Sequence, residues 1–251
     1  RSRGLGDVYK RQTMNKVYKV FPGGKFKVLT FSYDDGKIED RRLVKLFNKF
    51  NLKATFNLNT GIIDPAIRIP QEEWPELYKG HDIAVHTFTH PTMIRLNDYN
   101  ALREILDDKD NLEKIFKRPI YGLAYPNGSY DNRIVDIAKS VGIKYARVTN
   151  DKYAATKAAE AYAANADGPM LIGDENGFSM PEDYMCWVPT CHHNHNLIDF
   201  GKKFMALTKK QYLYMMYVWG HSFEFERNNN WEIIEEFCEM IANRDDIWYA
   251  T

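Results

Sequence analysis

The sequence predicts an α/β fold, either a barrel or a doubly wound sheet, and three observations indicate it. Short apolar runs alternate with segments of helical periodicity along most of the 251 residues. Polar and titratable residues follow directly after the apolar runs, at positions where parallel strands place functional groups. No internal repeat is visible, and the length fits one large domain or two small ones.

Seven apolar runs are predicted to be strands. The first, 27–33 (KVLTFSY), ends at the turn Asp34-Asp35-Gly36, and the second, 54–58, ends at Asn59. The other five follow in order at 82–87, 122–125, 144–149, 187–189 and 213–219. A barrel with one polar end would gather the residues that follow these strands from across the whole sequence.

Four segments between the strands carry apolar residues at helical spacing and are predicted to be helices: 40–50, 102–116, 133–141 and 231–241. An Ala-rich segment, 153–166, is expected to be a helix inserted between two core strands.

Composition excludes several classes of protein. Lys and Arg total 34, as do Asp and Glu, so the net charge is zero and the basic surplus that a nucleic-acid partner needs is missing. No apolar run approaches the ~20 residues of a membrane span. Three cysteines without a CxxC pair make a poor disulfide framework and favour a reduced protein.

The N-terminus is treated separately. Residues 1–12 (RSRGLGDVYKRQ) have no apolar stretch of the kind a signal peptide needs, and they look like translated sequencing-adapter sequence. We expect them to be a non-native extension, with 13–251 forming a single domain. Localisation stays open: the cytoplasm is favoured, and secretion is possible if a native N-terminus has been replaced.

His86 and His90 follow the third predicted strand. Histidines at i and i+4 lie on one helical face or bracket a tight turn, close enough to share a metal ion. The alternative is a chance pair of surface or core histidines.

Asp34 and Asp35 end the first predicted strand. Adjacent carboxylates on extended backbone point to opposite sides, so one can bind a metal while the other acts as a general base. The alternative is a turn whose side chains cap the following helix. One Asp with two His leaves metal positions open, which is the arrangement of a catalytic ion.

Three motifs resemble those of the polysaccharide deacetylase (NodB-homology) family, carbohydrate esterase family 4. Residues 30–36 (TFSYDDG) resemble its TFDDG motif, 80–90 (GHDIAVHTFTH) its second motif, and 125–131 (YPNGSYD) its third. His221 follows the last strand, where the family places its catalytic histidine. The resemblance runs from 25 to 241 and covers nearly the whole core.

This resemblance implies a single-domain, distorted (β/α)7-type barrel that removes acetyl groups from an N- or O-acetylated saccharide. Asp34 would be the general base on a metal-bound water and His221 the general acid, with a backbone N–H near Asn127 helping to bind the oxyanion. One divalent ion would be held, with zinc as the first expectation and cobalt, nickel or iron also suitable. Its three ligands would be Asp35, His86 and His90.

The third motif departs from the family at one position. The arginine that usually orients the base is replaced by Ala124. Arg147, at the end of the next predicted strand, could place a guanidinium beside Asp34 instead, and a surface arginine is the alternative.

The substrate-binding candidates are Tyr125, Asn127, Arg147, Trp187 and His193. Asp183 and Trp187 weakly resemble the fourth motif, in which an aspartate tunes the catalytic histidine and a tryptophan walls the acetyl pocket. A core Trp and a helix-capping Asp are the alternative. Residues 191–195 (CHHNH) are either a second metal site or, as we prefer, a polar loop at the barrel mouth, because contiguous residues converge on one ion only with strain.

Two other functions compete with deacetylation. A metal-independent amidohydrolase acting on a small C–N compound would be expected to lose a ligand, and all three are present. A non-catalytic carbohydrate-binding relative is supported only by the missing arginine. The sequence leaves the identity of the saccharide and the oligomeric state open.

Overall fold

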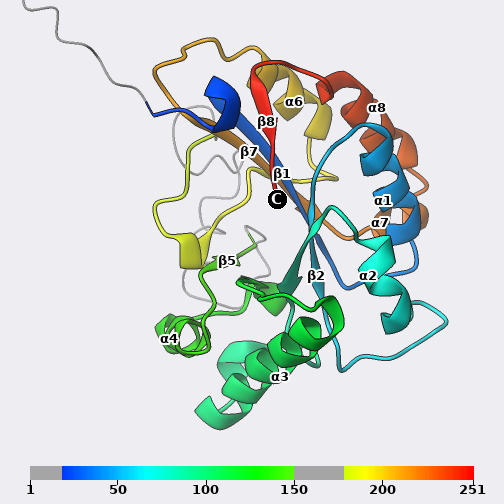
Figure 1. The fold of residues 1–251 in the computed structure, drawn as a ribbon, viewed down its shortest axis with the longest axis vertical. Coiled ribbons are helices and arrows are strands. Elements are labelled where there is room, and N and C mark those ends of the chain that lie inside the picture. The colour runs from blue at the N-terminus through cyan, green and yellow to red at the C-terminus, as the bar shows by residue number, and fades with distance from the viewer. Residues whose placement is uncertain (1–18, 150–177) are drawn as a thin grey trace, which may run out of the picture.

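The computed structural model describes residues 19–149 and 178–251, whose strands form one sheet (Figure 1). The strands are β1 (Lys27–Asp34), β2 (Thr55–Leu58), β3 (Asp82–Val85), β4 (Gly122–Ala124), β5 (Tyr145–Arg147), β6 (Cys191–His192), β7 (Tyr214–Gly220) and β8 (Ile247–Tyr249). Their order is β5-β4-β3-β2-β1-β7-β6, and all these neighbours pair in parallel. β2 pairs the second half of β1 and β8 pairs its first half.

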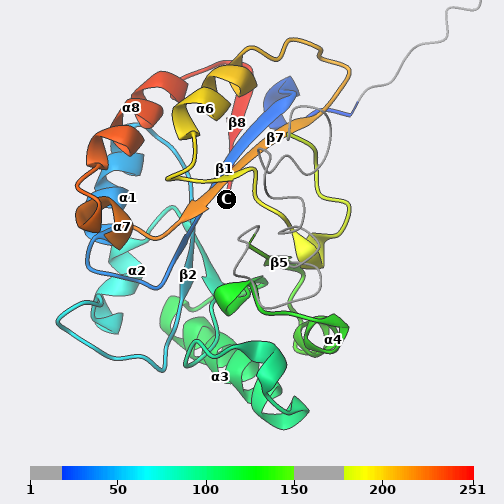
Figure 2. The ribbon, with the colours of Figure 1, turned by 180° about the vertical axis from the view of Figure 1, so that it is seen from behind.

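The sheet curls into a distorted barrel because one segment bonds to both of its edges (Figure 2). At β5, the Trp187 backbone N–H donates to Ala146 O at 2.8 Å. Three residues later, the Thr190 N–H donates to Tyr217 O of β7 at 2.7 Å. The prediction of a single distorted barrel, rather than a doubly wound sheet, is confirmed.

The strand predicted at 187–189 is wrong. Trp187 forms only an isolated bridge with Arg147, and the strand lies at Cys191–His192. Pro189 stands between them and has no N–H to continue a ladder, so the segment leaves β5 and joins β7 on its far side.

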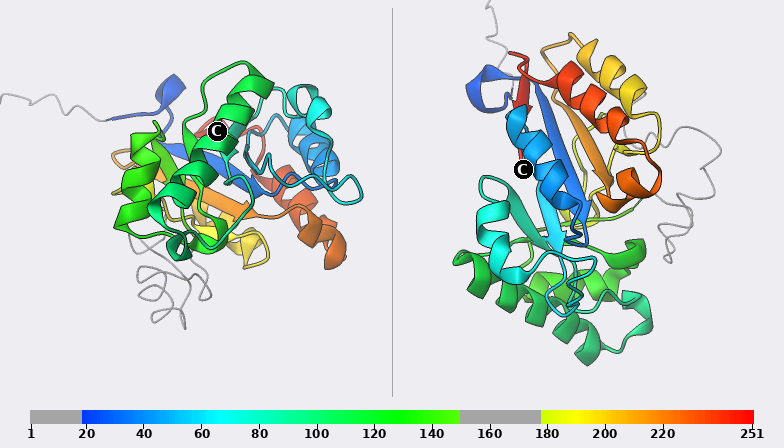
Figure 3. Two further views of the ribbon diagram at one scale, coloured as in Figure 1. Left: turned by 90° about the horizontal axis from the view of Figure 1, so that it is seen from below. Right: turned by 90° about the vertical axis from the view of Figure 1, so that its right-hand side faces the viewer.

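The helices cover the outside of the sheet, with α1, α6 and α8 forming a layer beside β1 and β7 (Figures 1 and 3). The α-helices are α1 (Asp40–Lys49), α2 (Trp74–Leu77), α3 (Asp98–Phe116), α4 (Asn132–Ser140), α6 (Leu197–Met205), α7 (Phe223–Arg227) and α8 (Trp231–Ile241). Short 3₁₀ turns are η1 (Pro22–Gly24), η2 (Gln71–Glu73), η3 (Met93–Arg95), η4 (Pro126–Gly128) and η5 (Tyr184–Cys186).

The four predicted helices are confirmed with small shifts at their ends. α3 begins four residues before the predicted start because the Asn97 side chain accepts a hydrogen bond from the Asn100 N–H and caps the helix. The sequence did not predict α2, α6, α7 or β8. The predicted helix at 153–166 and the extension at 1–12 lie outside the described residues. Within 19–149 and 178–251, no helix combines the length and the apolar character that crossing a bilayer requires.

β1 shows how the sheet positions a functional side chain. On one face, Phe31 packs against Phe47 of α1, with ring centroids 4.6 Å apart. On the other face, Ser32 and Asp34 hydrogen-bond with Arg147 of β5, across the barrel interior. Since side chains alternate along a strand, the apolar face that packs on the helices forces these polar groups inward.

Candidate active site

The turn after β1 brings two carboxylates to one place. Asp35 has a left-handed backbone (φ 84°), which turns its side chain back beside that of Asp34. Asp34 Oδ2 lies 3.7 Å and Asp35 Oδ1 4.0 Å from the same atom, His86 Nε2. Arg68 stabilises this strained turn by donating to the Asp35 backbone carbonyl. The two carboxylates therefore do not point to opposite sides, as an extended strand would direct them.

His86 is held in one tautomer. Its Nδ1 lies 2.8 Å from the backbone carbonyl of Ala124, and a carbonyl only accepts, so Nδ1 carries the proton. Nε2 then presents a lone pair, and that atom is buried without a hydrogen-bond partner. Burial, opposed by the charge of Asp34, lowers the pKa of His86 to about 4, so the ring is neutral at neutral pH.

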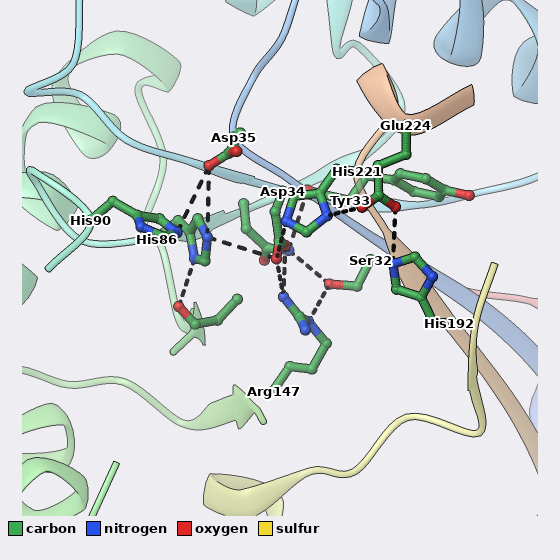
Figure 4. Close-up of polar contacts among 12 residues, drawn as sticks. Ser32, Tyr33, Asp34, Asp35, His86, His90, Arg147, His192, His221 and Glu224 are labelled. Atoms are coloured by element: carbon green, nitrogen blue, oxygen red, sulfur yellow. Dashed lines mark hydrogen bonds and ion pairs between the residues drawn. The ribbon is translucent and has the colours of Figure 1, made fainter. Parts of the chain in front are cut away.

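Asp35, His86 and His90 converge as the sequence predicts (Figure 4). Asp35 Oδ1 lies 4.0 Å from Nε2 of each histidine, and all three ligand atoms lie within 4.8 Å of one another. Metal–ligand bonds of ~2.0–2.2 Å place neighbouring ligand atoms roughly 3–4 Å apart, so a small contraction completes the set. The nitrogen and oxygen donors and the unpaired lone pair of His86 fit one divalent ion.

Asp34 is a buried carboxylate held by an arginine. Arg147 Nη2 donates to Asp34 Oδ1 at 2.7 Å and to Oδ2 at 2.5 Å, and Asn57 Nδ2 donates to Oδ1 at 2.7 Å. Burial by itself raises the pKa of Asp34, but the charges of Arg147 and of the neighbouring histidines outweigh it. The pKa of this carboxyl is held well below its usual range, and the group is ionised.

Arg147 takes the place of the arginine missing at Ala124. Its Nε donates to Ser32 Oγ at 3.1 Å, and its guanidinium carbon lies 4.6 Å from the ring centroid of Trp219. Only 1% of Arg147 is exposed, which excludes the surface arginine. The predicted contact of Arg147 with Asp34 is confirmed. Ala124 contributes to the site only its backbone carbonyl, which accepts the hydrogen bond from His86 Nδ1.

His221 lies on the other side of Asp34 from His86 (Figure 4). Its Nε2 is 3.9 Å from Asp34 Oδ2, and its Nδ1 is 3.5 Å from Glu224 Oε1 of α7. Burial lowers the pKa of His221, but Glu224 and Asp34 outweigh that effect, and the pKa is raised. The arrangement favours a protonated imidazole between two carboxylates.

Glu224 contacts three histidines. Its Oε1 faces His221, and its Oε2 faces the loop at 191–195. Oε2 lies 3.0 Å from Nε2 of both His192 and His193, so these three also place ligand atoms within 4.8 Å of one another. The Asn194 N–H donates to His192 Nδ1 at 3.2 Å, which puts the His192 proton on Nε2, facing Glu224. A metal at Nε2 would displace that proton, so the contacts favour a hydrogen-bonded loop over a second metal site.

The remaining predicted residues lie in different settings. Tyr125 is buried, stacks on Tyr130 and directs its hydroxyl to Met185 O, while Asn127 is exposed in η4 with a left-handed backbone. Trp187 packs against Tyr217, at a centroid distance of 5.1 Å. Asp183 accepts a hydrogen bond from the Met185 N–H and caps η5, so the capping alternative holds for it.

A family model described as polysaccharide deacetylase matches residues 22–146. The chain belongs to this family. None of the curated proteins compared with the chain matches it. The matched region contains Asp34, Asp35, His86 and His90 and ends one residue before Arg147.

Solved structures extend the likeness of fold. A proposed polysaccharide deacetylase from Mycobacterium smegmatis has 14% identity and a TM-score of 0.60, over 94% of this chain and 90% of that one. A family 4 carbohydrate esterase from Streptomyces lividans, in complex with acetate, has 12% identity and a TM-score of 0.53, over 85% and 87%.

The deacetylase PplD from Streptococcus pyogenes, in complex with acetate, has 27% identity and a TM-score of 0.46, over 48% of this chain and 55% of that one. The chain therefore spans about half the length of this relative.

Three residues of this deacetylase-family site were not predicted: Ser32, Asn57 and Glu224. Ser32 lies two residues before Asp34 on β1, and Asn57 pairs with Asp34 in the register of β1 and β2, so the two-residue period of a strand was a usable signal for Ser32. Glu224 follows His221 at i+3, a spacing that places two side chains together on one helical turn.

Proposed function

We propose that the protein is a metal-dependent hydrolase that removes acetyl groups from an N- or O-acetylated saccharide. The observation that carries the proposal is the convergence of Asp35, His86 and His90 beside a separate, ionised Asp34. Metal ligands beside a carboxylate that is not itself a ligand suit hydrolysis by an activated water. Family membership supports the acetylated saccharide as the substrate class.

Asp34 is the proposed general base. Arg147 donates to both of its oxygens and Asn57 to Oδ1, while Oδ2 also faces Nε2 of both His86 and His221. When bound, the ion supplies a Lewis acid that polarises the acetyl carbonyl and lowers the pKa of water. Asp34 accepts the proton of the attacking water, and Arg147 keeps that carboxylate oriented during the transfer.

His221 is the proposed general acid. Its raised pKa keeps the imidazole protonated, and Glu224 beside Nδ1 leaves Nε2 directed toward Asp34. From there it donates a proton to the departing amine or alkoxide. The pKa of Asp34 is lowered and that of His221 is raised, so at one pH the first is ready to accept a proton and the second to donate one.

Calorimetry and acetate release test this proposal together. Chelator-stripped wild type is titrated with Zn²⁺, beside His86→Ala, and each protein is then assayed on N-acetylated and O-acetylated oligosaccharides. We expect one zinc site and acetate release from the wild type, and neither from the variant. A wild type that releases acetate equally with and without zinc contradicts the metal-dependent mechanism, and release of acetate only from small amides contradicts the substrate class.

A further inference from the structure

The buried face of α3 carries an acid where its apolar pattern predicts a core residue. The buried positions of this helix are Ala101, Ile105, Asp108 and Leu112, spaced as one core-facing stripe. Asp108 has no exposed surface. Burying a carboxylate costs free energy unless hydrogen bonds satisfy it, so its partners indicate why it is there.

Asp108 joins the ends of two neighbouring strands. Its Oδ1 accepts hydrogen bonds from the Thr60 N–H at 2.6 Å and from Thr60 Oγ1 at 2.8 Å, just after β2. Its Oδ2 accepts from the His86 N–H at 3.1 Å, just after β3. Asp108 is therefore hydrogen-bonded directly to the backbone of a proposed metal ligand.

Glu104 holds the same loop one helical turn earlier. Its Oε2 accepts from the Thr89 N–H at 2.7 Å, and its Oε1 accepts from Thr89 Oγ1 at 2.6 Å. The backbone carbonyl of Glu104 also accepts from the Phe88 N–H at 2.9 Å. Residues 86–90 are thus attached to α3 at His86, Phe88 and Thr89.

This loop has a backbone that needs such support. Thr87 (φ 64°) and His90 (φ 59°) are both left-handed, and Thr87 is β-branched, which makes that conformation unfavourable. Strained residues persist only where the surroundings determine them. The bonds from α3 fix the Phe88 N–H, which belongs to the peptide unit after Thr87, and they fix Thr89, the residue before His90.

We propose that Asp108 and Glu104 are positioning residues that hold His86 and His90 in ligand geometry. The inference rests on the metal site proposed above. Groups that orient metal ligands typically affect metal affinity by ~10–100-fold. Replacing Asp108 with Asn turns one of its two accepting oxygens into an NH2 group, which cannot accept from Thr60 or from the His86 N–H, so we expect zinc affinity to fall by about that factor.

Asp40→Asn is the matched control. Asp40 is also an aspartate without exposed surface, but its carboxylate accepts from the Tyr78 hydroxyl at 2.7 Å, outside the loop. Calorimetry gives the Zn²⁺ affinity of both variants and of the wild type, and the visible spectrum of bound Co²⁺ gives the ligand geometry. We expect weaker zinc binding and a changed cobalt spectrum in Asp108→Asn alone, although both variants lose stability.

Three results overturn the inference: unchanged zinc affinity in Asp108→Asn, an equal loss in Asp40→Asn, or wild type that binds neither ion. The last also overturns the metal site itself, which distinguishes the two failures. Should Asp108→Asn not fold, Glu104→Gln on the partly exposed face decides. We expect about a 3- to 10-fold loss of zinc affinity from it, and wild-type affinity there contradicts the inference.

Discussion

The two sides of Asp34 are built differently. On the metal side, the ligands are Asp35, in the turn after β1, and His86 and His90, in the loop after β3, and left-handed residues shape both turns. On the acid side, Glu224 of α7 lies beside His221 at the end of β7, and His192 comes from β6, which pairs with β7. The metal side is built from two turns at strand ends, and the acid side from α7 and the strand that pairs with β7.

The two sides also differ in how the family model covers them. The family model covers the metal side and stops at residue 146. Beyond it lie Arg147, which takes over from the position of Ala124, and the acid side with Glu224. Because neither Asp34 nor His221 is among the proposed metal ligands, metal binding and proton transfer are expected to respond to mutation independently.

The largest effect is expected from the proton-transfer groups. Asp34→Asn and His221→Asn should each lower kcat by ~10²–10⁴-fold, the usual contribution of a general base or acid. Zinc affinity should stay near that of wild type because neither residue belongs to the ligand set. Steady-state kinetics and calorimetry on the same preparations check both points, and loss of zinc in Asp34→Asn would show that the two sides are not separate.

Arg147→Lys should have the next largest effect. A lysine cannot bond Asp34 and Ser32 at once or stack on Trp219 with a planar group. Losing such a charged hydrogen bond is expected to lower kcat about 10- to 100-fold. Turnover equal to wild type in a kcat measurement would contradict the positioning of Asp34 by this arginine.

Two glycines, one packed against the metal-side loop and one against the acid side, allow each side to be perturbed separately. A Cβ at Gly61 would lie 2.5 Å from the Phe88 carbonyl oxygen, and one at Gly220 would lie 2.1 Å from His193 Nδ1. Each alanine variant should lose about 1–3 kcal/mol of unfolding free energy to overpacking. Denaturant unfolding and zinc calorimetry together test the expectation that only Gly61→Ala also weakens zinc binding, and the reverse pattern would contradict the separation.

The smallest effect is a change in pH profile. The charge of Glu224 raises the pKa of His221, so Glu224→Gln should lower that pKa. The general acid must be protonated, and activity is lost as pH rises through its pKa. The alkaline limb of the kcat/KM profile should therefore move to lower pH in the variant, with activity at lower pH less affected. A limb that stays in place contradicts the pairing of Glu224 with His221.

The fold was predictable where local pattern and tertiary structure agree. Most strands and four helices follow from apolar periodicity, and Asp34, Asp35, His86 and His90 from motif order. The strand predicted at 187–189 was wrong because Pro189 ends the pairing with β5, and the chain then pairs with β7. The sequence does not show that β5 and β7 lie on either side of this segment. α6 was missed although its buried positions, Leu197, Phe200, Gly201 and Phe204, have helical spacing, and β8 was missed because three residues are too few to show a strand pattern.

The sequence alone determined the strand–helix alternation and which side chains stand at strand ends, because periodicity and turn residues act over a few positions. Only the tertiary structure decided that Arg147 contacts Asp34, that Glu224 rather than Asp183 accompanies His221, and that Asp108 bonds the His86 backbone. These contacts join residues 3 to 113 positions apart. The contact of His221 with Glu224 depends on the position of α7, and that of Asp34 with Arg147 depends on the curling of the sheet into a barrel. Burial makes them matter, since a charge without water must find its partner within the protein.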